Sequence, residues 1–337
     1  MTEQVWNEIL DNARWAPSAY NAQPWRFEIA GGTVTLLSRP ERWRPVIDPK
    51  NRETLISIGA LAHSLRVAAR GAGYVLEEEW LLSSPFDEEI ARFSLKEESS
   101  SSREELEALL GVRTWRREYR HEPISPARLE AIGELLGEYG ELAVKGSSEF
   151  KKVVDASVEA AVLHARSKEI YSELSPYLYH PRRNGHHTWG VVSPISERKG
   201  VREFFWNRLS NSRTALRKGY RASTITDSRD LLHQAPALIL LKGDGENPYD
   251  LIEVGARYQQ LRIEAFRMGL ATQPVSMLPQ MVNAKGMDPE HGVEKIQLLI
   301  RLGVPMETKK KPRSVREPVE TLLKNRTLPE GDASRAA

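Results

Sequence analysis

The sequence contains no cysteine among its 337 residues. Disulfides, thiolate nucleophiles and cysteine metal sites are therefore excluded together. An excess of charge of either sign is also missing, because 48 Lys and Arg residues nearly balance 46 Asp and Glu residues and leave a net charge of +2. Nothing in this composition demands a polyanionic partner, and we expect no nucleic-acid interaction. The basic clusters at 113–120 and 309–316 are short, and are typical of anion sites or solvated surface.

Long hydrophobic runs are missing as well. No uncharged stretch approaches the roughly 20 residues needed to cross a bilayer. The first residues, Met1-Thr2-Glu3-Gln4, lack the basic region and apolar core of a signal peptide. We therefore expect a cytoplasmic protein without membrane contact, long enough for one large or two ordinary domains.

An unusual loop follows the first helical run, Glu3 to Arg14. Two prolines seven residues apart, Pro17 and Pro24, forbid a continuing helix and predict an extended, irregular loop. Between them lie the hydroxyl of Ser18 and the carboxamides of Asn21 and Gln23. Amides both donate and accept, which suits a heterocycle with carbonyls and ring nitrogens along one edge. The alternative is that these side chains only satisfy local backbone groups, and the residues alone leave both interpretations open.

The loop resembles the signature of a known family. The pattern Ala-Pro-Ser-x-x-Asn-x-Gln-Pro-Trp, at residues 16–25, is similar to that of the FMN-dependent nitroreductases, in which the loop reaches the flavin across a dimer interface. The resemblance implies an α+β, nitroreductase-like, three-layer α/β/α fold. It also implies FMN as the cofactor, NADH or NADPH as the possible reductant, and Ser18, Asn21 and Gln23 as flavin-binding residues.

One helical pattern occurs twice. The stretch 58–74 aligns without gaps to 254–270, and six residues coincide in type, including Gly59 with Gly255 and Arg66 with Arg262. A strand-like run precedes each copy, at 34–37 and 237–241. The pattern favours an internal duplication over two unrelated buried helices that share small residues.

Two basic segments are candidates for binding a phosphate. Arg113, Thr114 and Arg116 offer guanidinium groups and a hydroxyl, the groups that a phosphate needs, although such a segment is more often solvated surface. It resembles the family's Arg-Arg-Ser-x-Arg phosphate segment, with Val112 in place of the first Arg and one extra residue before Tyr119. A closing strand around 300–305 and a basic arm resemble the family's carboxyl-terminal part, which also reaches the phosphate and makes Arg313 a further candidate.

The order of these parts predicts a single-chain pseudo-dimer. Residues 1–110 would form a first half with the loop, and 111–337 a second half with the Arg-rich segment, a lid at about 174–232 and the basic arm. This arrangement resembles the Acg-like branch of long single chains. One flavin site per chain follows, because neither motif has a visible second copy, and the chain would be a monomer or pair again as a homodimer.

The lid segment is aromatic, basic and rich in histidine, and we expect short helices that cover a pocket. His180, His186 and His187 lack the spacing of a metal site, so we expect no metal. No catalytic residue is assigned, because in a flavoprotein the cofactor performs the redox chemistry. Tyr177, Tyr179, His186 and His187 are candidates only for a proton donor in the lid.

The leading hypothesis is thus an FMN-dependent oxidoreductase that passes hydride from NAD(P)H to a small acceptor, such as a nitroaromatic or a quinone. The alternative is a protein that sequesters or stores FMN beneath its lid with little turnover. A third hypothesis is a cofactor-free scaffold or partner-binding protein, which would require the Arg-rich segment to be plain surface.

Overall fold

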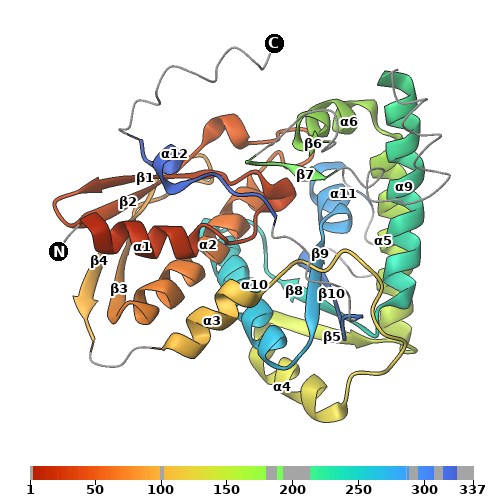
Figure 1. Cartoon of the computed structure of the whole chain (residues 1–337). Helices are drawn as coiled ribbons and strands as arrows, with labels where there is room; N and C mark the ends of the chain where they lie inside the picture. Colours follow the sequence, from red (N-terminus) through yellow and green to blue (C-terminus); the bar gives the residue numbers. More distant parts are fainter. Residues whose placement is uncertain are drawn as a thin grey trace.

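The structure is a computed structural model that describes residues 3–98, 102–179, 188–192, 213–285, 287, 295–306 and 314–324. Helices and strands are mixed along the chain, as in the α+β class (Figure 1). The first part contains α1 (Glu3–Ala13), β1 (Trp25–Ala30), β2 (Thr33–Ser38), α2 (Arg52–Gly71), β3 (Tyr74–Trp80), β4 (Glu89–Glu97) and α3 (Arg103–Gly111). The second part contains α4 (Pro126–Leu136), β5 (Gly140–Val144), α5 (Ser148–Arg166), α6 (Lys168–Leu174), β6 (Leu178–Tyr179), β7 (Val191–Val192), α9 (Arg213–Gln234), β8 (Ala237–Lys242), α10 (Pro248–Arg267), β9 (Ala271–Val275), α11 (Met277–Lys285), β10 (Ile296–Gly303) and α12 (Val319–Leu322).

Two four-stranded antiparallel sheets have the same topology. The strand order is β1-β2-β4-β3 in the first sheet and β5-β8-β10-β9 in the second. The two orders are identical when the strands are matched in chain order: β5 to β1, β8 to β2, β9 to β3 and β10 to β4. The helix α2 connects the second and third strands of the first sheet, and α10 connects their counterparts in the second. The internal duplication predicted from the repeated helical pattern is therefore confirmed.

The second sheet is buried on both faces. Side chains alternate along β8, so that Ile239 and Leu241 pack into the core around α2 and α10, while Leu238 and Leu240 pack against α5, α9 and α11. This arrangement of helices on both sides of a sheet gives the second half its three layers (Figure 1).

The two repeated helices cross at a pair of glycines. A Cβ on Gly59 would lie 1.8 Å from the carbonyl oxygen of Ile252, and a Cβ on Gly255 would lie 1.9 Å from that of Ile56. Ile56 and Ile252 are 196 residues apart, as are Gly59 and Gly255. Each contact is therefore repeated with the partners exchanged, which is the geometry of a twofold interface.

The halves differ in what joins their first two strands. In the first half β1 and β2 form a hairpin that turns at Gly31 and Gly32, both with positive φ. In the second half the segment 145–236 lies between β5 and β8, with α5, α6 and the 22-residue α9 among its elements. We expected short helices at 174–232. This was wrong for the last part of that segment, which belongs to the long helix α9.

The last described segment, residues 314–324, returns to the first half. Leu323 bridges to Phe27 of β1, and the backbone amide of Lys324 donates to the carbonyl of Phe27 (2.9 Å). Figure 1 shows α12, in blue, beside β1 and α1, in red. The expectations for the first half were incomplete, since β1 and β4 were not predicted. Among the described residues, no helix is both long and apolar enough to span a membrane.

Candidate functional site

A cavity of about 730 Å³ lies between the two halves. The first half contributes the loop residues 17–20 and one face of α2. The second half contributes the segment 115–118, part of α9, the end of β9 and the start of α11. Tyr258 of α10 and Arg301 of β10 also line it. The helix crossing brings these walls together, because Ile56 and Ala60 of α2 face the cavity beside Tyr258.

The loop of the first half has a strained backbone. Tyr20, Asn21 and Gln23 have φ angles of +52°, +55° and +50°, in the left-handed region that non-glycine residues rarely adopt. Such conformations cost about 1–3 kcal/mol each and persist only where surrounding contacts hold them. The Ser18 hydroxyl accepts from the backbone amide of Gln23 (3.0 Å), and the amide of Ala19 donates to Ser57 of α2 (3.3 Å). The sequence predicted an irregular loop, and the structure adds a tight turn at Ala19–Asn21.

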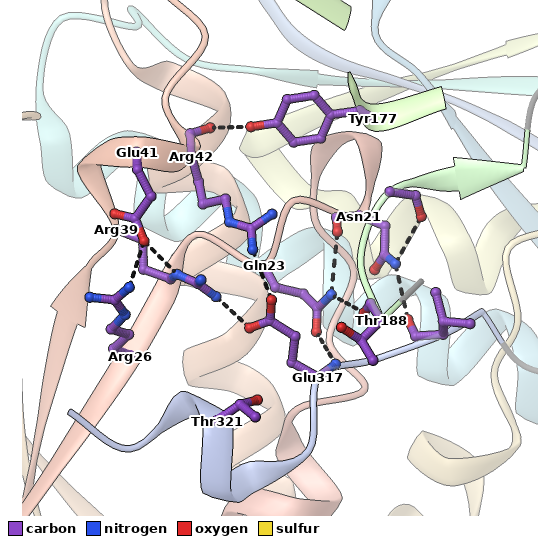
Figure 2. A network of polar contacts seen from close by, with 12 residues as sticks. Asn21, Gln23, Arg26, Arg39, Glu41, Arg42, Tyr177, Thr188, Glu317 and Thr321 are labelled. Atoms are coloured by element: carbon purple, nitrogen blue, oxygen red, sulfur yellow. Dashed lines mark hydrogen bonds and ion pairs between the residues drawn. The ribbon is translucent and has the colours of Figure 1, made fainter. Parts of the chain in front are cut away.

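The carboxamides of Asn21 and Gln23 bind other segments of the chain (Figure 2). Asn21 Nδ2 donates to the carbonyls of Gly190 and Val315, both at 3.0 Å. Gln23 Nε2 donates to the carbonyl of Thr188 (2.8 Å), and its Oε1 accepts from the backbone amide of Glu317 (2.8 Å). Neither residue lines the cavity. Their assignment as flavin ligands stays a prediction.

Glu317 anchors the carboxyl-terminal segment beside this loop. Its buried carboxylate accepts from Arg39 and from Arg42 (2.8 Å), as Figure 2 shows. The Arg42 guanidinium also lies 4.3 Å from the ring centre of Trp189. The amide and ion-pair contacts together fix the segments 188–190 and 315–317 against the loop. The sequence analysis missed this cluster, since its members come from widely separated parts of the chain.

The residues predicted to bind phosphate separate into two groups. Arg116 lines the cavity, as Ser18 does from the opposite half. Arg113 does not line it, and its Nη1 donates to the carbonyls of Leu110 and Val112, both at 2.7 Å. Thr114 forms a bridge to Thr272 at the start of β9. Arg313 lies outside the described residues.

Two buried arginines were not selected from the sequence, and one of them, Arg301, lines the cavity. Arg301 is 1% exposed and Arg262 is 5% exposed. Neither forms an ion pair with a carboxylate in the described part of the chain, and burial lowers the pKa of both. The Arg262 guanidinium lies 5.5 Å from the ring centre of Tyr258, whose buried hydroxyl has no hydrogen-bond partner among the described residues. A signal was available for Arg262, because the gap-free alignment of the repeated helix pairs it with Arg66.

A second polar group lies where the loop meets α5 and α11. The Tyr20 hydroxyl donates to Gln280 Oε1 (3.4 Å) and lies 3.5 Å from His164 Nε2. Gln280 in turn donates to Glu53 (2.8 Å). Burial lowers the pKa of His164 to about 4 and raises that of Tyr20. At neutral pH the imidazole is therefore uncharged and the phenol keeps its proton.

The proposed proton donors of the lid are only partly described. The Tyr177 hydroxyl donates to the carbonyl of Arg42 (3.3 Å), outside the cavity lining. His186 and His187, as well as His180, lie outside the described residues, and of Tyr179 only the backbone is described.

Comparisons with known proteins point to one family for the start of the chain. Residues 1–47 match the family model described as the nitroreductase family. Over 66 residues the chain is 36% identical to the protein named "Putative NAD(P)H nitroreductase Rv3131" of Mycobacterium tuberculosis (strain ATCC 25618 / H37Rv), a match that covers 20% of this chain and 19% of that protein. The matched part thus spans about a fifth of the relative's length.

Solved structures give weaker likenesses. A nitroreductase with bound FMN from Bacteroides fragilis NCTC 9343 is 14% identical, covers 68% of this chain and 100% of its own, and has a TM-score of 0.38. The FMN and NADPH-dependent nitroreductase NfnB from Sphigopyxis sp. strain HMH is 18% identical, covers 66% and 99%, and has a TM-score of 0.40. The fold described above rests on the sheets and helices of the chain itself.

Proposed function

We propose that the whole chain is a flavoprotein of the nitroreductase family, in its single-chain twin (Acg-like) branch. It would bind FMN in the cavity and pass electrons from NADH or NADPH to a small acceptor such as a nitroaromatic or a quinone. The observation that carries this proposal is the composition of the cavity walls. The family's loop, at Pro17 to Tyr20, lies on one side, and Arg116 lies on the other. The match of residues 1–47 to the family supports it independently.

The cavity suits a cofactor of this kind. Its volume of about 730 Å³ is within the range of small-molecule sites. Tyr258, Arg301, Gln234 and His164 line it, and each has a buried polar side-chain atom without a hydrogen-bond partner among the described residues. Apolar side chains complete the walls, among them Ile56, Leu178, Val191 and Val275. A planar heterocycle with a polar tail needs this mixture of apolar walls and a few polar groups.

Bound FMN would supply the redox chemistry, and the chain would position it and control access to it. The loop residues and Ile56 would face the ring, while Arg116 would face the anionic tail. Arg113 and Thr114 do not line the cavity, so they would bind the phosphate only if it extends beyond the cavity to them. Tyr20 holds its proton at the wall, 3.5 Å from the neutral imidazole of His164. The raised pKa makes this phenol a poor acid, so no described group is assigned as the proton donor.

One site per chain is proposed, with the halves divided at about residue 110. The counterpart of the loop in the second half would lie between α4 and β5, where only Gly137–Tyr139 intervene. Flavin released from denatured holoprotein should therefore reach about one equivalent per chain and not two.

The visible spectrum of the purified protein, before and after anaerobic NADPH, tests the function. A flavin band that bleaches with NADPH and returns with a nitroaromatic or a quinone supports the oxidoreductase. A flavin band that NADPH leaves unchanged would instead favour flavin storage, the alternative function. A colourless protein that cannot be loaded with FMN would refute both.

A further inference from the structure

One wall of the cavity comes from a helix that the first half does not share. The helix α9 belongs to the segment between β5 and β8, whereas the equivalent strands of the first half, β1 and β2, are joined by a hairpin. Figure 1 shows α9 running beside α5, on the outer side of the second sheet. The side chains that α9 presents to the cavity are therefore an addition to the duplicated framework.

Three hydroxyl-bearing side chains of α9 line the cavity. Tyr220, Thr224 and Ser228 follow one another at intervals of four residues, so they lie on one face of the helix. Their exposed fractions are 6%, 8% and 8%, which means that they are buried from bulk solvent. These three residues are called the hydroxyl row below.

The contacts within the hydroxyl row leave it able to bind a ligand. A hydrogen bond joins the side chains of Thr224 and Tyr220, and Ser228 Oγ donates to Met277 Sδ at 3.8 Å. A hydroxyl has one proton and two lone pairs, so one contact uses only part of its capacity. A thioether sulfur is a weak acceptor, and an oxygen atom of a ligand would therefore be a better partner for the Ser228 proton.

The surroundings of the row are polar and disfavour negative charge. Tyr20 of the loop interacts electrostatically with both Tyr220 and Glu53. Burial raises the pKa of Tyr20 and lowers that of His164 to about 4, so both side chains are uncharged at neutral pH. The Glu53 carboxylate lines the cavity here, paired with Arg44 (3.4 Å). An anionic ligand at the row would face this carboxylate, whereas an uncharged ligand would not be repelled.

Arg116 and Arg301, which line the cavity, lie towards the other end of β9. The backbone amide of the residue before Arg116 donates to the carbonyl of Thr272 (2.9 Å), near the start of β9. Arg301 pairs with Gln273, the next residue of that strand. Ser228 instead contacts the second residue after the end of β9. The strand thus separates a cationic end of the cavity from the end that carries the hydroxyl row.

We propose that Thr224 and Ser228, positioned with Tyr220, bind the oxygen atoms of an uncharged electron acceptor and select it against anionic analogues. The inference rests on the proposed function, because it gives the acceptor a place in the same cavity. The anionic tail of FMN would occupy the cationic end at Arg116. A carboxylate at the hydroxyl row would lose its water and face Glu53, whereas an amide or quinone oxygen would gain a hydroxyl donor.

Substitutions within α9 separate the hydroxyl groups from the shape of the wall. Thr224→Val removes one hydroxyl with little change in shape, and Ser228→Ala removes another. Thr224→Ser keeps the hydroxyl and removes only the methyl group. Thr226→Val is the matched control, because Thr226 lies on the opposite face of the helix and does not line the cavity. Melting temperatures check that each variant is folded.

The measurement compares two ligands of nearly the same shape and different charge. Isothermal titration calorimetry of the FMN-loaded chain, without reductant, gives the Kd for para-nitrobenzamide and for para-nitrobenzoate. The wild type should bind the amide at least about tenfold more tightly than the carboxylate. Thr224→Val and Ser228→Ala should each weaken binding of the amide by about two- to tenfold, the effect of one hydrogen bond. Thr224→Ser and Thr226→Val should retain the wild-type Kd.

An unchanged Kd in both Thr224→Val and Ser228→Ala would overturn the inference. An equal loss in Thr226→Val, or a carboxylate that binds as tightly as the amide, would overturn it as well. If the chain cannot be loaded with FMN, the proposed function fails, and the flavin-free chain is titrated with para-nitrobenzamide instead. The same ranking of the variants would then support the hydroxyl row as a binding wall for an uncharged ligand, and equal Kd values in all of them would overturn it.

Discussion

Gly59→Ala should destabilise the protein, although alanine normally stabilises a helix. The added Cβ would lie 1.8 Å from the carbonyl oxygen of Ile252, whereas real Cβ contacts are essentially never shorter than 3.0 Å. The obstacle is backbone, so α2 and α10 must separate by about 1.2 Å. A gap of that size forfeits a large part of the dispersion energy along the crossing. The loss, of about 3 kcal/mol, exceeds the gain of about 1 kcal/mol from helix propensity and leaves a net destabilisation of about 2 kcal/mol.

The twofold geometry adds a sharper expectation. Gly255→Ala should cost about the same, because its Cβ would meet the carbonyl oxygen of Ile56 at 1.9 Å. One separation of the helices relieves both clashes, so the double variant should cost clearly less than the sum of the single variants. Gly133→Ala in α4 is the control: its Cβ would have only an ordinary contact at 3.9 Å, and it should stabilise by up to about 1 kcal/mol.

Urea unfolding of the four variants measures these free energies. A Gly59→Ala protein within about 0.5 kcal/mol of the wild type would refute the reasoning. Strict additivity in the double variant would refute the shared separation. Flavin retention in the same proteins gives a second readout, since Ile56 and Ala60 on α2 also line the cavity.

Two further predictions concern buried charge. Glu317→Gln should destabilise the chain by about 3 kcal/mol in urea unfolding, because Arg39 and Arg42 lose their buried counter-ion. Glu41→Gln is the control: it removes a half-exposed carboxylate and should cost less than about 1 kcal/mol. Equal losses in the two variants would contradict this prediction. His164 has a pKa of about 4 in the folded chain and about 6.5 when unfolded, so its contribution of about 3 kcal/mol is complete above pH 6.5 and lost as the pH falls to 4. His164→Asn should flatten the melting temperature over that window, and an unchanged profile would show that the imidazole is not buried and neutral.

The repeated helix made the duplication predictable from sequence. The shared glycines, arginine and apolar residues fall within one continuous stretch, so a gap-free alignment of 17 residues shows the repeat. Strands such as β1 and β4 were missed because their exposed faces carry Arg26, Glu28 and Arg92, which dilute the apolar signal of a half-buried strand. The strand β8 was found, since it is apolar on both faces.

The cavity was predictable only in part. Ser18 and Arg116 were selected because each belongs to a compact motif, and the structure brings both to the cavity wall. Arg301 was missed because its place at the cavity depends on how β10 packs in the tertiary fold, which no local pattern in the sequence indicates. Conversely, the amides of Asn21 and Gln23 were conspicuous in sequence, but their bonds to segments 165 or more residues away depend on the tertiary fold.

The joining of two pseudo-equivalent halves in one chain changes how the cavity depends on protein concentration. A cavity whose walls come from two separate molecules is lost on dilution, because the two molecules must associate to form it. Here the loop and Arg116 are covalently connected, so their meeting is intramolecular and its equilibrium does not contain the protein concentration. The cavity should therefore persist at any dilution at which the chain is folded, and a single copy of the molecule would suffice to form it.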